Sequence, residues 1–151
     1  MKKQSLRMVV ILSFLMILSV SSAHAQSSRE MTAKIPFSFI VANKTFPAGD
    51  YSVTRLNPQS DKAALAIKSM DGRLSKVVLT MSVQAGALQE RAKLVFTRYN
   101  DQYYLSQIWT PADNTGLELP KSRSERTLLA RNLAGERAPE RMTIPLTARR
   151  R

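Results

Sequence analysis

The carboxylates are the side chains of this sequence best suited to catalysis, because two of them can share general acid and general base roles. A glycosidase, for example, needs two carboxyl groups about 5–9.5 Å apart across a cleft. All the aspartates fall in or beside predicted turns, where an Asp side chain caps its own backbone. They are Asp50, Asp61, Asp71, Asp101 and Asp113. Their positions in the sequence do not indicate that any two of them face each other across a cleft. A carboxylate-based hydrolase is therefore a minor alternative, and we predict no catalytic residue.

Other reactive groups are scarce. The sequence has no Cys, and its one His, His24, lies in a predicted leader segment. Without His or Cys, the rest of the chain can form no disulfide, no zinc site of the usual Cys/His kind and no Ser-His-Asp or Cys-His nucleophile. The five glycines are scattered through turns and form no phosphate-binding loop. We therefore expect a protein that is not an enzyme and uses no metal or cofactor.

Residues 1–25 have the features of a cleaved signal peptide. Three basic residues precede an apolar run at 8–20, and residues 21–25 (SSAHA) end in the small-x-small pattern that signal peptidase accepts. The run is shorter than the roughly 20 apolar residues of a membrane-spanning helix. We therefore predict export to the periplasm or the extracellular space, with the processed chain starting at Gln26 and containing no transmembrane segment.

The positive charge is concentrated near the C-terminus. The whole chain has a formal net charge of +12, and residues 121–151 carry nine basic and three acidic side chains. The segment 134–151 is rich in Arg, Pro and Glu, and we predict that it is a disordered basic tail. Its arginines are candidate contacts for an anionic surface, and they are Arg137, Arg141, Arg149, Arg150 and Arg151. The alternative is a solvated tail that only improves solubility, and export argues against specific nucleic-acid binding.

Residues 32–133 are predicted to form one β-rich domain. Apolar and polar residues alternate in several short segments, which is typical of half-buried strands. Turn residues separate these segments, as at Pro47-Ala48-Gly49, Asp71-Gly72 and Asn100-Asp101. About seven such strands predict an all-β, mainly antiparallel fold. The sequence leaves open whether it is a small sandwich or a barrel.

Two predicted hairpins have a definable register. In the hairpin at 93–109, a turn at Asn100-Asp101 places Phe96 opposite Leu105, and Leu94 and Trp109 are expected on the same face. In the hairpin at 63–83, we favour a longer turn that places Ile67 opposite Val77 over a two-residue turn that places it opposite Lys76. The residues predicted to form the core are Phe37, Phe39, Phe96, Leu105 and Trp109.

The sequence Ser122-Arg123-Ser124-Glu125 matches a capping box, in which the Ser hydroxyl and the Glu carboxylate each accept a backbone N–H. It predicts a short C-terminal helix over 123–132. Leu128, Leu129 and Leu133 are expected to anchor this helix to the strands.

Three sequence blocks resemble a family of short exported hypothetical proteins of acidobacterial type. The blocks are IPFSFIVANKTFPAGDYSV, LVFTRYNDQYYLSQIW and LELPKSRSER, and the resemblance covers roughly residues 34–131. The resemblance implies a β-rich exported domain. It implies no activity and transfers no site residues.

These observations favour an exported, non-enzymatic β-domain that acts by binding, or as a structural part, in the cell envelope or outside the cell. Its partner is unknown. The main alternative is a barrel that carries a small apolar ligand, with Phe37, Phe39, Phe96 and Trp109 lining its cavity. In the favoured interpretation, the same side chains fill the core.

Overall fold

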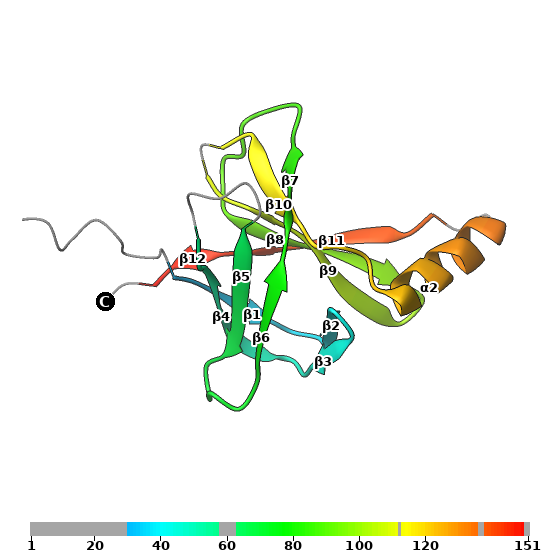
Figure 1. Ribbon diagram of the computed structural model, residues 1–151, viewed down its shortest axis with the longest axis horizontal. Helices are drawn as coiled ribbons and strands as arrows, with labels where there is room; N and C mark the ends of the chain where they lie inside the picture. The colour runs from blue at the N-terminus through cyan, green and yellow to red at the C-terminus, as the bar shows by residue number, and fades with distance from the viewer. Residues whose placement is uncertain (1–29, 58–62, 112, 136–137, 150–151) are drawn as a thin grey trace, which may run out of the picture.

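In the computed structural model, the residues described are 30–57, 63–111, 113–135 and 138–149, and they form two β-sheets and one helix (Figure 1). The helix is α2 (Arg123–Ala134). The strands, in chain order, are β1 (Met31–Ile35), β2 (Phe39–Val41), β3 (Lys44–Phe46), β4 (Gly49–Arg55), β5 (Ala64–Ser69), β6 (Ser75–Leu79), β7 (Met81–Gln84), β8 (Lys93–Tyr99), β9 (Gln102–Trp109), β10 (Thr115–Glu118), β11 (Glu140–Pro145) and β12 (Thr147–Ala148).

Strands that lie side by side in a sheet are not always consecutive in the chain. Sheet A has the order β12-β1-β4-β5-β6, and sheet B has the order β11-β8-β9-β10-β7. The short strands β2 and β3 join sheet B through β2, which lies parallel to β9, whereas the other pairings are antiparallel. The prediction of an all-β, mainly antiparallel fold with one helix near the C-terminus is confirmed.

The architecture is sandwich-like, so the barrel alternative for the fold is wrong. The twelve described strands also exceed the predicted seven or so. Three extended segments pass from one sheet to the other and are each divided into two strands, and β11 and β12 lie in the segment predicted as a tail. The first breaks at Pro36, which has no N–H to donate to a ladder. The second bends at Thr80, whose backbone N–H and hydroxyl both donate to the carbonyl of Ala63. The third bends at Leu146, whose N–H donates to the carbonyl of Ala92.

The core between the sheets is centred on aromatic rings. Phe39 and Phe46 stack with their centroids 5.3 Å apart, and Phe39 contacts Tyr51 of sheet A and Phe96 of sheet B edge to face. Phe39, Phe96, Leu105 and Trp109 are buried. Phe37 is only partly buried, and its ring stacks on Tyr103 at 4.1 Å.

Trp109 faces away from this core, contrary to the prediction that it shares a face with Leu105. The pairing of Phe96 with Leu105 is as predicted, but the register shifts between Val95 and Phe96. A β-bulge adds one residue to one strand, so every side chain beyond it changes face. Ile108 therefore joins the core cluster in place of Trp109. The Trp109 ring instead covers Gly116 on the neighbouring strand.

The register preferred for the hairpin of β5 and β6 is also wrong. Ile67 lies opposite Lys76, as the shorter turn requires. The turn is fixed by side-chain hydrogen bonds, because the Ser69 hydroxyl donates to Asp71 and accepts from the N–H of Leu74. As a result Val77 and Leu79 are exposed, which is tolerated because β6 is an edge strand of sheet A.

The predicted disordered tail is wrong over most of its length. Strand β11 pairs with β8 along all six of its residues, and β12 pairs with β1. A salt bridge of 3.3 Å between Arg98 and Glu140 joins β8 to β11. The segment pairs with the sheets because it supplies apolar side chains to the core: Ile144 packs against the core and Leu146 is buried. In the sequence, the many Arg and Pro residues obscured the alternation of these apolar residues with polar ones.

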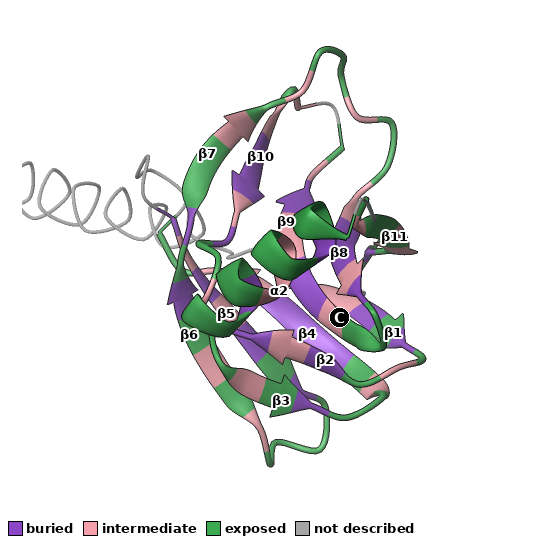
Figure 2. Ribbon diagram, turned by 90° about the vertical axis from the view of Figure 1, so that its right-hand side faces the viewer, coloured by how far each residue is buried: buried purple, intermediate pink, exposed green. Residues whose placement is uncertain are grey.

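Helix α2 begins as the capping box predicts. Ser122 is the N-cap, and its Oγ accepts a hydrogen bond from the N–H of Glu125 at 3.1 Å. The helix continues two residues beyond the predicted end, to Ala134. Its buried residues are polar, namely Glu125 and Asn132. Of the leucines predicted to anchor it, Leu128 and Leu129 are only partly buried, and Leu133 is exposed, so its part in the anchor is wrong. Most of its surface is exposed (Figure 2).

The contact between Trp109 and Gly116 gives a test of the packing. A Cβ at position 116 would lie 2.6–2.8 Å from three atoms of the Trp109 ring. We expect Gly116→Ala to lower the free energy of unfolding by about 1–3 kcal/mol, because the ring must move. Urea unfolding followed by Trp109 fluorescence measures this change.

The matched control is Gly86→Ala. Nothing lies within 4 Å of a Cβ at Gly86. This change should alter the free energy of unfolding by less than about 0.5 kcal/mol. Equal urea midpoints for the two variants would contradict the observed packing of Trp109.

Candidate functional site

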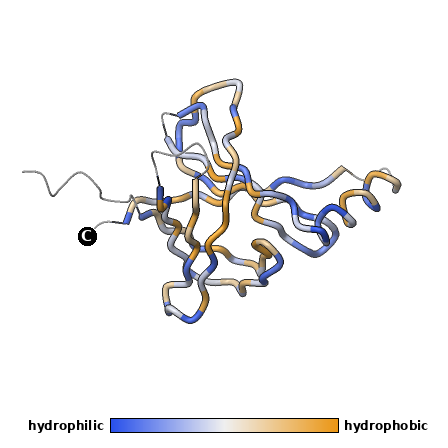
Figure 3. Tube along the Cα trace, in the orientation of Figure 1, coloured by the Kyte–Doolittle hydropathy of each residue, from blue (hydrophilic) through white to orange (hydrophobic). Residues whose placement is uncertain are grey.

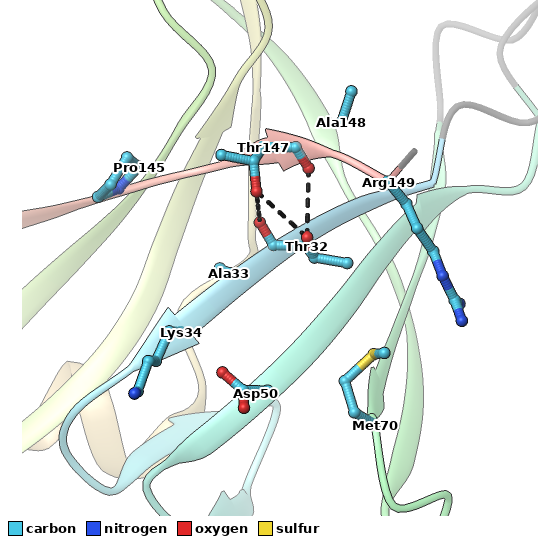
Figure 4. Close-up of a pocket in the computed structure, with 9 residues that line it drawn as sticks. All are labelled: Thr32, Ala33, Lys34, Asp50, Met70, Pro145, Thr147, Ala148 and Arg149. Atoms are coloured by element: carbon cyan, nitrogen blue, oxygen red, sulfur yellow. Dashed lines mark hydrogen bonds between the residues drawn. The ribbon is translucent and has the colours of Figure 1, made fainter. Parts of the chain in front are cut away.

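A groove of about 730 Å³ crosses the outer face of sheet A and is the main candidate site (Figure 4). It lies over β1, β4 and β12 and is open to solvent. Its volume falls within the roughly 300–1,000 Å³ of typical ligand sites. The residues that line it are Thr32, Ala33, Lys34, Asp50, Met70, Pro145, Thr147, Ala148 and Arg149.

One wall of the groove is held by hydrogen bonds between β1 and β12. The hydroxyls of Thr32 and Thr147 lie 3.2 Å apart, and each also lies within hydrogen-bonding distance of the other residue's carbonyl. At the end of β12, Arg149 donates to both carboxylate oxygens of Glu30 at 2.9 and 3.0 Å. The Arg149 guanidinium is therefore already neutralised and is not a free cation of the site.

The charged groups left in the groove are Lys34 and Asp50. They lie directly opposite each other on β1 and β4, and both are exposed. Neither forms an ion pair of 4 Å or less with another residue of the described ranges. A cation and an anion beside hydroxyls and the thioether of Met70 can hold a polar ligand that has groups of both charges. The groove therefore has the chemistry of a binding surface.

A smaller cavity of about 220 Å³ adjoins the groove and is lined by both Asp50 and Asp71. Hydrogen bonds from the Ser69 hydroxyl and from the Arg73 N–H lower the pKa of Asp71. A catalytic acid needs the opposite shift, because it must be protonated at the working pH. Tyr51, which also lines the cavity, donates its hydroxyl to the Pro47 carbonyl at 2.5 Å. These carboxyl and hydroxyl groups serve the turns of sheet A.

Glu125 is a buried carboxylate of a different kind. It is 5% exposed, and its Oε1 atom has no hydrogen-bond partner among the described residues. Burial raises the pKa of Glu125, against the lowering effects of Lys121, the Ser122 N–H and the Tyr99 hydroxyl. The pKa of Tyr99 is raised as well, first by burial and then by the nearby Glu125. This pair joins the first turn of α2 to the end of β8.

The structure describes two of the five arginines predicted to contact an anionic surface, and these two lie on different parts of the C-terminal segment. Arg141 is exposed on β11, and Arg149 lies beyond β12 in its ion pair with Glu30. Arg137, Arg150 and Arg151 lie outside the described residues. Sequence analysis also missed the groove, because the pairing of β1 with both β4 and β12 cannot be read from the alternation of either strand alone.

The aromatic and basic residues of the β8–β9 hairpin serve the fold. The Arg98 guanidinium lies 5.6 Å from the centre of the Tyr103 ring, and Tyr99 and Tyr104 meet edge to face at 5.7 Å. The rings of the main core likewise pack on one another. The idea of an apolar-ligand carrier therefore gains no support from these aromatic residues.

In the part of the chain that the structure describes, no three His, Cys, Asp or Glu side chains are grouped so that they could hold a metal ion. Over the same ranges, no helix is both long enough and apolar enough to cross a membrane. No protein-family model, curated protein or solved structure matches the chain. The site is therefore interpreted from its own geometry.

The buried Glu125 gives a prediction with a defined sign. Because its pKa is raised in the folded protein, its contribution to stability is fully present below the unfolded pKa of about 4.3. This contribution is lost as the pH rises through the higher folded value. Glu125→Gln stays neutral and can still form the capping box. We expect this variant to be at least as stable as the parent at pH 7 and to lose less stability between about pH 4 and pH 7.

Urea unfolding at the two pH values measures both effects. The control is Glu90→Gln, which removes an exposed carboxylate from the loop after β7. A Glu125→Gln variant that is much less stable than the parent at pH 7 would show that the ionised carboxylate stabilises α2.

Proposed function

We propose that this protein is an exported, non-enzymatic β-domain that acts by binding a polar ligand or partner in the groove over β1, β4 and β12. The observation that carries the proposal is the groove itself, with Lys34 and Asp50 exposed side by side and left without ion-pair partners among the described residues. The absence of Cys from the sequence and of His after residue 24 supports a role without covalent catalysis.

Export is supported by the features of residues 1–25 and by the resemblance to short exported proteins. The basic start, the short apolar run and the small residues before Gln26 fit a cleaved leader. The location would be the periplasm or the extracellular space, and the partner would belong to the envelope or its surroundings.

A carboxylate-based hydrolase is the weaker candidate. Asp50 and Asp71 do line one cavity, which is the feature that such an enzyme would need. The lowered pKa of Asp71, however, keeps it ionised, and its hydrogen bonds to Ser69 and Arg73 hold it in its own turn. Binding explains the same residues without a proton donor.

Export can be tested directly. We expect the protein recovered from the periplasm or the culture medium to begin at Gln26, because signal peptidase would cut after Ala25. Cell fractionation followed by mass spectrometry of the intact protein gives the N-terminus. Full-length protein confined to the cytosol would contradict export while leaving the groove unaffected.

Binding in the groove can be tested by photo-crosslinking in cells. A photoreactive phenylalanine in place of Thr147 should give a discrete adduct on irradiation, because the side chain at this position lines the groove. Adding Lys34→Ala and Asp50→Ala should reduce the adduct by about thirtyfold, if each charge contributes the roughly 1 kcal/mol of an exposed pair.

The control places the same photoreactive residue at Gln102, which is exposed at the start of β9 in sheet B. It should give no such adduct. Equal adducts at both positions, or an adduct at position 147 that does not depend on Lys34 and Asp50, would exclude the groove as the binding site.

A further inference from the structure

Helix α2 lies at one end of the long axis of the molecule, away from the groove (Figure 1). Only one face of the helix meets the sheets, through Glu125 and Asn132 with Leu128 and Leu129 beside them. The opposite face is exposed. It presents three arginines at positions 123, 126 and 131, which the helical repeat of 3.6 residues places on one side.

These three arginines differ from three other arginines of the described ranges. Arg73, Arg98 and Arg149 each have a carboxylate within 4 Å. Arg123, Arg126 and Arg131 form no ion pair with any described residue. Glu125, the acidic residue of the first turn of α2, is buried on the opposite face. The outer face of α2 therefore carries positive charge that the fold leaves uncompensated.

An apolar side chain accompanies this charge. Leu133 is 62% exposed and lies seven residues after Arg126, so the two side chains lie along the same edge of the helix. Orange, hydrophobic residues mark the far end of α2 in Figure 3. Ala130 and Ala134 are also exposed on this side, and their side chains are small. The face thus combines cations with an exposed leucine at the end of the helix.

We propose that the outer face of α2 docks on an anionic lipid surface. Lipid headgroups can pair with several arginines at once, and basic residues near such a surface each add measurable attraction. The leucine distinguishes this partner from a soluble acidic polymer, because only a lipid interface offers an apolar layer beneath the charges. This contact uses none of the groove residues and does not depend on the groove ligand.

The test is co-sedimentation of the chain starting at Gln26 with vesicles of phosphatidylcholine containing about a third phosphatidylglycerol. Binding should be absent with pure phosphatidylcholine and should weaken steeply as salt shortens the Debye length from about 10 Å to about 3 Å. Each arginine should contribute roughly fivefold, so that Arg123→Gln, Arg126→Gln and Arg131→Gln together weaken binding by about a hundredfold. Glutamine keeps the helix propensity, and circular dichroism checks the fold.

Two controls keep the proposal falsifiable. The combined Lys68→Gln, Arg73→Gln and Arg91→Gln variant removes the same charge from exposed positions outside α2 and should bind like the parent. Leu133→Ala should weaken binding to the vesicles but not to dextran sulfate. Equal losses in both triple variants would overturn the site, and a Leu133→Ala variant that binds vesicles like the parent would point to an acidic polymer and overturn the lipid partner.

Discussion

The contact between aromatic rings of the two sheets is the interaction on which the rest of this structure depends. Phe39 contacts Phe46, Tyr51 and Phe96 at centroid distances of 5.0–5.4 Å, so one side chain of a three-residue strand touches both sheets. Such contacts add to the large apolar area that each ring buries. Without disulfides, this cluster is what joins sheet A to sheet B. The short hairpin of β2 and β3 lies beside β9 and places Phe39 and Phe46 in the core.

The second constraint is the set of extended segments that leave one sheet and enter the other. Each bend is fixed by a local feature: the missing N–H of Pro36, the two hydrogen bonds of Thr80 to Ala63, and the buried side chain of Leu146. Strands that change sheet at a corner are a known way to join two packed sheets.

One consequence concerns the C-terminal segment, because β11 and β12 complete both sheets. Its removal would unpair β8 and β1 along their outer edges, so charge in this region must be studied by substitution and not by truncation.

Sequence reasoning succeeded where the deciding interaction is local. The turn at Asn100 and Asp101, with Asn100 at a positive φ of 55°, and the cap at Ser122 each depend on residues a few positions apart. It failed where the alternation of apolar and polar residues does not decide the outcome. The bulge between Val95 and Phe96 turns Trp109 away from the core, and the hydrogen bonds of Ser69 set the register of β6. The pairing of β11 with β8 is decided between segments that are distant in the chain. The groove could not be foreseen for the same reason, since its walls come from strands that are distant in the chain.

The distribution of charge follows from the same architecture. Among the described arginines of the basic C-terminal region, Arg149 is paired with Glu30, whereas Arg141 and the three arginines on α2 form no ion pair with another described residue. Pairing is possible where strands from distant parts of the chain run side by side. It is not possible on the outer face of a helix that touches the sheets along one side only.

Because α2 and β12 lie toward opposite ends of the molecule (Figure 1), a surface bound by the helix would leave the groove open to solvent and to a second ligand. The fold therefore keeps its two uncompensated polar surfaces apart, so that occupying one need not obstruct the other.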